Sequence, residues 1–469
     1  MSESSRKTYR PWEPQRYRQE AHSPETKLPE GDVVFFLLDT VSKLALSRVY
    51  ALYEDETRGA PPFDPTLMVC LLLYAYCVGV FSSRKIAQAC ERNLAFIAIV
   101  GQERPDFRTI SDCRKLPLDA FRAVFVPVLR IAGEAGRVQL GKVATEGTKL
   151  QGNASRHKAM SYGYMRQAAD RLREDIETLV TRAYQQDAED DAALGRRRGA
   201  ELLAELARRE ARWATIEAAM QRLEARAKAE AAAERQQRAA TEAERQRTGT
   251  KRRGTAPQPV QETPEDNAPT NCTDPELQIM PTNNKGWDYG GHAQVSVDAA
   301  SQLIVACDVT AEANDKQPAA PMAHLTIAPL GPAGIATPTN AMGAAQKIPA
   351  TYDSGYDSEA AVIAVEQGGF DPYMATGRQR HQASAAEVPE PPVTATERMA
   401  AKVRTPAGRA LYARRKVIVA PVFGQSKEAR GFRRFLLRGL DHIRGAWRVG
   451  CLTHNLLKLW RYACASLTV

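Results

Sequence analysis

Basic residues crowd the segment from Lys402 to Arg448, which contains thirteen lysines and arginines and only two acids. This local excess exceeds the net charge of +9 of the whole chain, and a basic surface of this kind usually meets phosphate. Pro421 is suited to the first turn of a helix, where its missing N–H costs nothing. On a helix that starts there, Lys427, Arg430 and Arg434 recur at spacings of three and four and would share one face. The alternative is a solvated basic helix without a ligand.

Two acidic side chains stand where predicted strands end. The segment Val143–Lys149 is a short strand candidate that carries Glu146 just before a glycine turn. The segment Ile348–Tyr356 is a second strand candidate, and it ends in Asp353 and another turn. An acid in such a place is most often simply solvated, so the residues alone leave a catalytic role open.

The composition bounds the class of protein. With 469 residues, 43% hydrophobic and 25% charged, the chain is expected to form two or three globular domains. Its positive charge favours an acidic partner, most commonly nucleic acid. We expect no membrane span, because no apolar run approaches eighteen residues, and no signal peptide, because Met1–Arg10 lacks an apolar core. A cytoplasmic protein is therefore expected. The eight cysteines form no Cys-x-x-Cys pair, which disfavours zinc ribbons and redox motifs.

Hydrophobic spacing divides the chain into regions of different type. Short helices with polar caps, such as Asp64 before Pro65, predict a helical N-terminal domain. An alanine- and charge-rich stretch without proline predicts a long helical hairpin, which is either a plain arm or a dimerising coiled coil. The predicted regions are a disordered N-terminus (1–30), a helical domain (31–137), a first strand with its acidic motif (138–158), the helical hairpin (159–248), a linker (249–270) and a second α/β part (271–469).

The order of predicted elements around the hairpin gives the fold class. A strand comes first, then two paired strands at 292–298 and 303–310, then a helix, a strand at 348–353, a helix and a last strand at 370–375. This order is that of a ribonuclease-H-like domain. We therefore predict a mixed α/β (α+β) chain: a helical N-terminal domain followed by a ribonuclease-H-like mixed sheet that a long helical insertion interrupts.

Several short motifs resemble those of bacterial insertion-sequence DDE transposases. The N-terminal likeness rests on four motifs: Phe63-Asp-Pro65, Leu71-Leu-Leu-Tyr-Ala-Tyr-Cys-Val-Gly79, Ser82-Ser-Arg-Lys-Ile86 and Arg108-Thr-Ile-Ser111. Further on, the likeness rests on Glu146-Gly-Thr-Lys149 with Asn153-Ala-Ser155, Tyr352-Asp-Ser-Gly-Tyr356, Pro421-Val-Phe-Gly424, Gly431–Gly439 and Thr453–Lys458. The resemblance covers about residues 30–165 and 270–462 and implies a ribonuclease-H-like catalytic domain.

The resemblance also implies site residues. Glu146, in place of the family's Asp, and Asp353 would be the first two catalytic carboxylates and would bind Mg²⁺ or Mn²⁺. The third family position is Ala420, which offers no ligand. Glu428 lies about 12 Å further along a helix and does not replace it, and the acids on the paired strands are weaker candidates. The residues expected to contact DNA are Lys149, Tyr412, Arg414, Arg415, Lys416, Lys427, Arg430, Arg433 and Arg434.

Three functions are compatible with these observations. The first is a transposase that binds the terminal inverted repeats of its element and target DNA as a homodimer, in the cytoplasm at the nucleoid, and cleaves and joins strands with a divalent metal. The second is a relative that binds DNA but has lost catalysis, as the missing third acid predicts. The third is a coiled-coil scaffold, which predicts little affinity for DNA.

Overall fold

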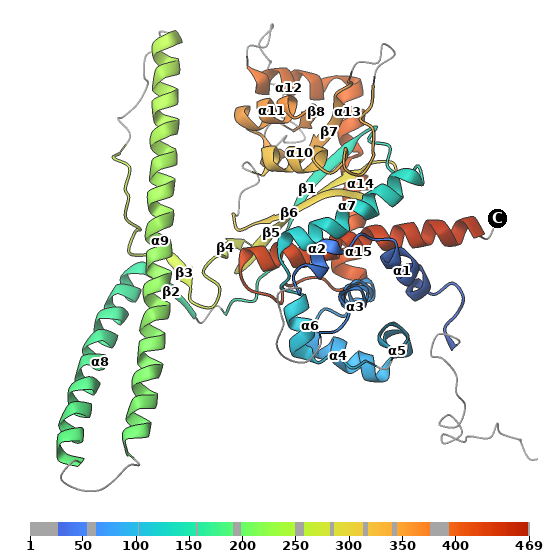
Figure 1. Ribbon diagram of the computed structural model, residues 1–469. Helices are drawn as coiled ribbons and strands as arrows, with labels where there is room; N and C mark the ends of the chain where they lie inside the picture. The colour runs from blue at the N-terminus through green and yellow to red at the C-terminus, as the bar shows by residue number, and fades with distance from the viewer. Residues whose placement is uncertain are drawn as a thin grey trace, which may run out of the picture.

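The protein was described from a computed structural model, which covers residues 27–53, 62–101, 103–155, 158–190, 198–248, 258–281, 286–312, 318–339, 345–375 and 394–467. The fold is mixed α/β: helices from the N-terminal third lie against one side of a mixed sheet, and two long helices project away from it (Figure 1). Nearly all of the predicted N-terminus 1–30 lies outside the described residues.

Seven helices form the N-terminal region. They are α1 (Val33–Ser42), α2 (Ser47–Tyr50), α3 (Pro65–Cys77), α4 (Ser83–Arg92), α5 (Leu94–Val100), α6 (Phe107–Cys113) and α7 (Leu118–Glu134). The predicted cap is confirmed, because the Asp64 carboxylate accepts a hydrogen bond from the backbone N–H of Thr66 at 2.6 Å. Helix α3 is apolar nearly all round and buried along most of its length, as its sequence requires.

The central sheet has strands β1 (Val143–Gln151), β4 (Gln278–Pro281), β5 (Trp287–Asp298), β6 (Ile304–Thr310), β7 (Ile348–Tyr352) and β8 (Phe370–Met374). Strand β1 is central: it pairs antiparallel with β5 and parallel with β7, and β8 follows parallel to β7. Strands β4 and β6 both pair antiparallel with β5, at its beginning and towards its end. The paired strands and the two later strands predicted from the sequence are thus confirmed.

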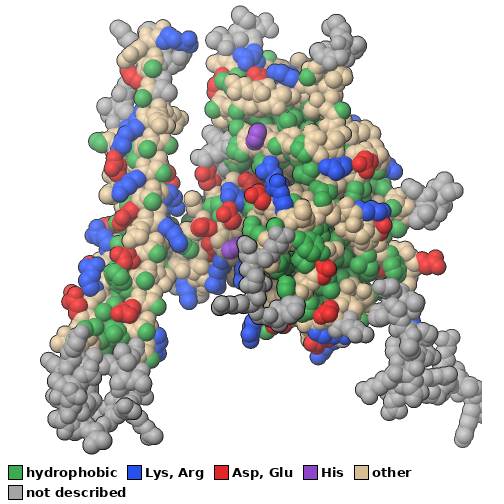
Figure 2. Space-filling model, in the orientation of Figure 1, with side chains coloured by type: hydrophobic (Ala, Val, Ile, Leu, Met, Phe, Trp, Pro, Cys, Tyr) green, Lys and Arg blue, Asp and Glu red, His purple; other side chains and the backbone are tan. Residues whose placement is uncertain are grey.

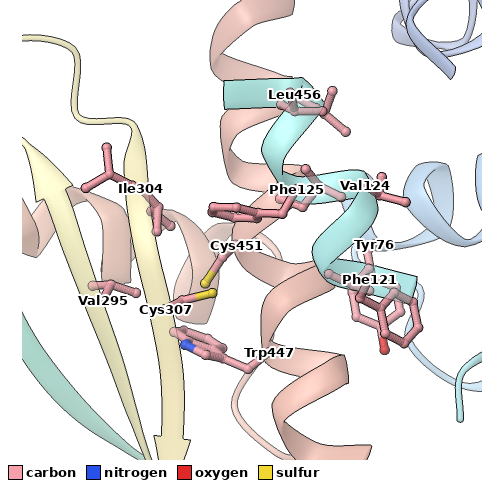
Figure 3. Packing of buried hydrophobic residues seen from close by; sticks show 14 of the residues in the cluster. Tyr76, Phe121, Val124, Phe125, Val295, Ile304, Cys307, Trp447, Cys451 and Leu456 are labelled. Atoms are coloured by element: carbon pink, nitrogen blue, oxygen red, sulfur yellow. The ribbon is translucent and has the colours of Figure 1, made fainter. Parts of the chain in front are cut away.

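The main core lies between this sheet and two long helices, α7 and α15 (Leu440–Leu467). Figure 3 shows Phe125 of α7 and Trp447 and Cys451 of α15 facing Val295 and Cys307 of the sheet. Trp447 is 1% exposed, and its indole N–H donates to the Gln294 carbonyl at 3.0 Å. Burying one such aromatic side chain stabilises a fold by about 1.5–3 kcal/mol, so this layer anchors the C-terminal helix firmly to the sheet.

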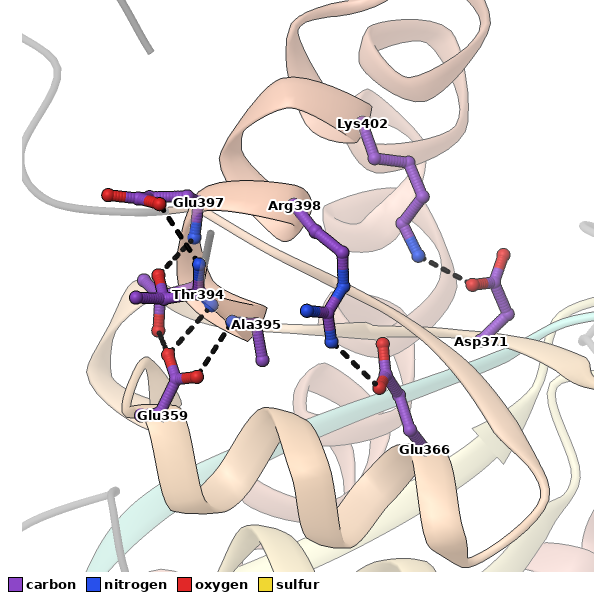
Figure 4. Close-up of polar contacts among 9 residues, drawn as sticks. Glu359, Glu366, Asp371, Thr394, Ala395, Glu397, Arg398 and Lys402 are labelled. Atoms are coloured by element: carbon purple, nitrogen blue, oxygen red, sulfur yellow. Dashed lines mark hydrogen bonds and ion pairs between the residues drawn. The ribbon is translucent and has the colours of Figure 1, made fainter. Parts of the chain in front are cut away.

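Helices α10 (Ala319–Ile327), α11 (Glu359–Gln367), α12 (Ala395–Arg404) and α13 (Pro406–Ala413) form a second block around β7 and β8 (Figure 1). Polar contacts hold α12 to its neighbours (Figure 4). The Glu359 carboxylate accepts from the backbone N–H of Ala395 at 2.7 Å, which caps the start of α12. Lys402 and Asp371 form an ion pair at 2.5 Å. These contacts hold α12, at the start of the basic segment, against α11 and β8.

The long insertion is an arm of two helices, α8 (Tyr162–Asp190) and α9 (Arg198–Thr248). A short stem, β2 (Ala159–Ser161) paired with β3 (Pro269–Asn271), joins the arm to the sheet domain. The arm has a small core of its own around Met165 and Ile216. Acidic and basic side chains alternate along its visible face (Figure 2). Within the described ranges, neither these nor the other helices carry an apolar stretch that would span a bilayer.

Candidate active site and basic surface

The two acids singled out from the sequence meet where β7 ends beside the middle of β1. The glycine turn predicted after Glu146 is wrong, because β1 continues through Gly147 to Gln151. The parallel pairing of β1 with β7 sets Thr145 opposite Tyr352. Glu146 and Asp353 each come one residue later, so their side chains leave the sheet on the same face. Both carboxylates contact a single guanidinium, that of Arg415, which confirms that they lie close together.

Arg415 lies between the two carboxylates. Its Nη1 donates to Glu146 Oε2 at 2.7 Å and its Nη2 to Asp353 Oδ1 at 3.1 Å. The Arg415 side chain is only 6% exposed, whereas those of Glu146 and Asp353 are 28% and 44% exposed. The planar fork of an arginine suits such a bridge, and a charge-assisted pair with this little solvent is stronger than a surface ion pair. Burial raises the pKa of the neighbouring Tyr412 hydroxyl, and the charge of Asp353 raises it further. The charge of Arg415 offsets part of this increase.

Arg415 is the first residue of helix α14 (Arg415–Gly424), and this helix differs from the sequence prediction. The helix does not begin at Pro421 but contains it. Pro421 has no N–H to donate to the Val417 carbonyl one turn earlier. The Gln302 side chain takes that place, since its Nε2 donates to Val417 O at 3.1 Å. A tertiary hydrogen bond therefore lets the helix continue through the proline.

The predicted basic face of that helix is also wrong. A π-helical turn covers Gln425–Ala429, and Gly431, with a φ of +74°, turns the chain out of the helix. Lys427 lies in the π turn, where its Nζ donates to Thr148 Oγ1 of β1 at 2.6 Å. Arg430 follows the turn and Arg434 lies in extended chain beside the end of β1. The three side chains therefore do not form one helical stripe.

Ala420, the third position implied by the resemblance, is exposed. It follows Arg415 by five residues, which places it about 140° around the helix from Arg415. The residues of α14 that are buried with Arg415 are Ile418, Val419 and Val422. A carboxylate at position 420 would therefore be exposed, on a different side of the helix from Arg415.

The other acids considered from the sequence have partners elsewhere. Asp298 is fully buried and accepts from the backbone N–H of Leu140 and of Ser301, so it shapes the β5–β6 turn. Asp308 pairs with Arg444 at 3.2 Å, and Glu428 pairs with Arg433 on the surface. These interactions are structural.

The donor set does not fit the divalent metal that the resemblance implies. Magnesium takes about six oxygens at 2.0–2.1 Å, several of them from carboxylates or water. Here two carboxylates point at a guanidinium, and across the described ranges no three His, Cys, Asp or Glu side chains converge as a metal site.

Basic side chains accompany β1 along its whole length. Lys142, just before the strand, donates to the Leu411 carbonyl, and burial and the nearby Arg414 lower its pKa to about 8. Lys427 reaches Thr148 in the middle of the strand. Arg434 Nε donates to the Gly152 carbonyl at 3.2 Å just beyond its end. These cations come mostly from the C-terminal basic segment, 270 or more residues away in the chain.

The residues expected to contact DNA differ in exposure. Arg414, Lys416, Arg433 and Arg434 are exposed, Lys149, Tyr412 and Lys427 are half-buried, and Arg415 and Arg430 are buried. Burial lowers the pKa of Lys427, as its partial enclosure requires. A guanidinium that is buried and bonded through its Nη atoms to groups inside the protein is not open to an external phosphate. The expectation for Arg415 and Arg430 is corrected accordingly.

Arg430 links three parts of the chain. Its guanidinium donates to the Gly450 carbonyl at 3.0 Å, to Thr453 Oγ1 at 2.6 Å and to Ser426 Oγ at 2.9 Å. Gly79, at the end of α3, packs so tightly against Arg430 that a Cβ there would lie 2.6 Å from its carbonyl oxygen. The N-terminal helices therefore rest directly on the basic segment.

Two supporting residues were not identified from the sequence. Gln294 of β5 lies opposite Gly147, and its Oε1 accepts from the hydroxyl of Tyr356, in the turn that follows Asp353. Gln302 holds α14 at Val417. Neither polar residue stands in a recognisable motif with its partner, because the contacts join segments 62 and 115 residues apart. A signal existed only for Tyr356, which belongs to the family-like Asp353 motif.

Comparison with known protein families gives two matches, one near each end of the chain. Residues 22–116 match a family described as a transposase domain (DUF772), and residues 377–460 match a family described as a transposase DDE domain. Two separate parts of the chain are therefore similar to transposase domains. The N-terminal match spans α1 to α6, and the C-terminal match spans the basic segment and α14 but neither Glu146 nor Asp353. No curated protein and no solved structure matches the chain.

Proposed function

We propose that this protein is a relative of the DDE transposases that binds duplex DNA along β1, with Arg414, Lys416, Arg433 and Arg434 contacting phosphates. The observation that carries the proposal is the row of cations beside β1, from Arg414 near Lys142 to Arg434 at Gly152. Ten residues of strand span about 33 Å at about 3.3 Å per residue. This length is close to one helical turn of B-DNA, about 34 Å, so the row of cations can contact phosphates along one turn of a duplex.

The same sheet order supports a ribonuclease-H-like fold for the DNA-binding body. Three antiparallel strands, β1, β5 and β6, adjoin two parallel strands, β7 and β8, as the predicted order of elements requires. In such a fold Glu146 and Asp353 would lie at the centre of the DNA surface. Their pairing with Arg415 favours a protein that holds DNA over one that cleaves it in this state.

The salt dependence of DNA binding tests the proposal. Affinity for a duplex of about 30 base pairs would be measured by fluorescence anisotropy between 50 and 200 mM salt. Each phosphate contact contributes about 0.9 to the slope of log affinity against log salt. The double variant Arg414→Ala/Lys416→Ala should therefore lower the slope by about 1.8. Both residues are exposed, so the fold should be unaffected.

The matched control is Arg171→Ala/Arg173→Ala on α8, which removes two exposed charges from the arm. It should leave the slope unchanged. Equal slopes for the wild type and the Arg414→Ala/Lys416→Ala variant would place the DNA elsewhere. The absence of measurable binding by the folded wild-type protein would exclude the proposed function altogether.

A further inference from the structure

We propose that Arg415 is the resident cation of the Glu146–Asp353 pair, so that the free protein excludes divalent metals from this pair and binds DNA without them. The inference concerns which ion occupies the carboxylates. Its first part stands without the proposed function, and its second part, on DNA, rests on it.

The geometry places the guanidinium where a shared metal would lie. One Arg415 nitrogen is 2.7 Å from Glu146 Oε2 and the other is 3.1 Å from Asp353 Oδ1. An ion that bridges the same two oxygens has to occupy the space between them. A guanidinium and a metal ion cannot share that space, so metal binding requires Arg415 to withdraw.

The packing of α14 opposes that withdrawal. Arg415 shares its side of the helix with Val419 and Val422, which are 0% and 1% exposed. The guanidinium also lies 5.8 Å from the centre of the Tyr412 ring. The bond from Gln302 to the Val417 carbonyl fixes the helix two residues after Arg415. Withdrawal would break both ion pairs and leave two neighbouring carboxylates without a counter-charge.

The surrounding charge also disfavours a divalent cation. Arg415 already offsets one of the two negative charges. Lys427 reaches Thr148, two residues from Glu146 on the same side of β1. A doubly charged metal ion would approach a neighbourhood in which two cations, Arg415 and Lys427, already face two carboxylates. The same cations attract a DNA phosphate, so its binding needs no bridging metal ion.

A manganese titration of the free protein tests the first part, with the unbound ion followed by electron paramagnetic resonance. The wild type should show no stoichiometric site. The variant Arg415→Gln should gain one Mn²⁺ per chain, and the double variant Arg415→Gln/Glu146→Gln should lose it again. The matched control Arg414→Gln removes the same charge from an exposed neighbour and should gain nothing. Circular dichroism establishes that each variant is folded.

Two results would overturn the inference. One is a Mn²⁺ site in the wild type that disappears in Glu146→Gln, which would mean that Arg415 yields readily to the metal. The other is a folded Arg415→Gln variant that gains no site. If Arg415→Gln does not fold, the wild-type titration still decides the question, because it needs no variant at position 415.

Duplex binding in EDTA and in Mg²⁺ at equal ionic strength tests the second part. Affinity of the wild type should not increase with Mg²⁺. An increase that Glu146→Gln abolishes would contradict metal-independent binding. Failure to bind DNA in either buffer would refute the proposed function and the second part while leaving the manganese result to stand on its own.

Discussion

Replacing Arg430 by alanine separates a structural arginine from a DNA-binding one. Three hydrogen bonds from a charged donor contribute about 1.5–3 kcal/mol each before desolvation is counted. Burial lowers the pKa of this guanidinium, which reflects the desolvation of its charge on folding. The alanine variant no longer carries this desolvation penalty of several kcal/mol, so the penalty offsets part of the lost hydrogen-bond energy. We expect Arg430→Ala to lower the free energy of unfolding by about 2–4 kcal/mol.

Urea denaturation followed by circular dichroism measures this loss. The control is Arg433→Ala, whose side chain is 65% exposed and pairs only with Glu428 on the surface, and which should change stability by less than about 0.5 kcal/mol. Salt-dependent DNA binding supplies the opposite readout. Arg430→Ala should keep the wild-type slope where the protein is folded. A slope lower by about 0.9 with unchanged stability would refute our assignment and return Arg430 to the DNA surface.

Two further predictions concern the support of the basic segment. Gly79→Ala should destabilise the protein by more than about 1 kcal/mol in urea, because Gly79 has a φ of +78° and no space for a Cβ against Arg430; an unchanged midpoint would contradict this packing. His454 is buried, and burial lowers its pKa to about 3. The contribution of the neutral histidine to the free energy of unfolding is therefore fully present above the unfolded pKa of about 6.5 and is lost as pH falls towards 3. His454→Gln should therefore lose less stability than the wild type between pH 6.5 and 3, and parallel pH profiles of the two proteins would count against a neutral buried histidine.

The sequence predicted the elements of the sheet because each strand and its turn are local patterns. Glu146 and Asp353 were located by family-like motifs, and the parallel pairing of two strands brings them together, although Glu146 lies inside β1 rather than at its end. The role of Arg415 was not predictable in this way, since its contacts with Glu146 span 269 residues. Only the folded chain decides whether an arginine in a basic cluster faces solvent or a carboxylate.

Helix α14 shows why a local rule failed. Proline is normally tolerated in the first turn of a helix, so a helix start at Pro421 was the reasonable prediction. The bond from Gln302 satisfies the carbonyl that proline leaves open and moves the start of the helix back to Arg415. Within this helix Ala420 is exposed and lies about 140° around the axis from Arg415.

The stem of the arm has a consequence for how an insertion of this size is accommodated. Strands β2 and β3 bring Ala159 and Asn271 side by side, so the sheet domain meets the arm as though it were a short connection. Closing a flexible loop of about 110 residues instead of one of about four would cost roughly 3 kcal/mol more in chain entropy. The paired helices and their stem avoid that penalty, so β1 can pair with β5 as though only a short loop joined the two strands. An arm built in this way can lengthen, shorten or be exchanged for a tight turn without disturbing the register that places Glu146.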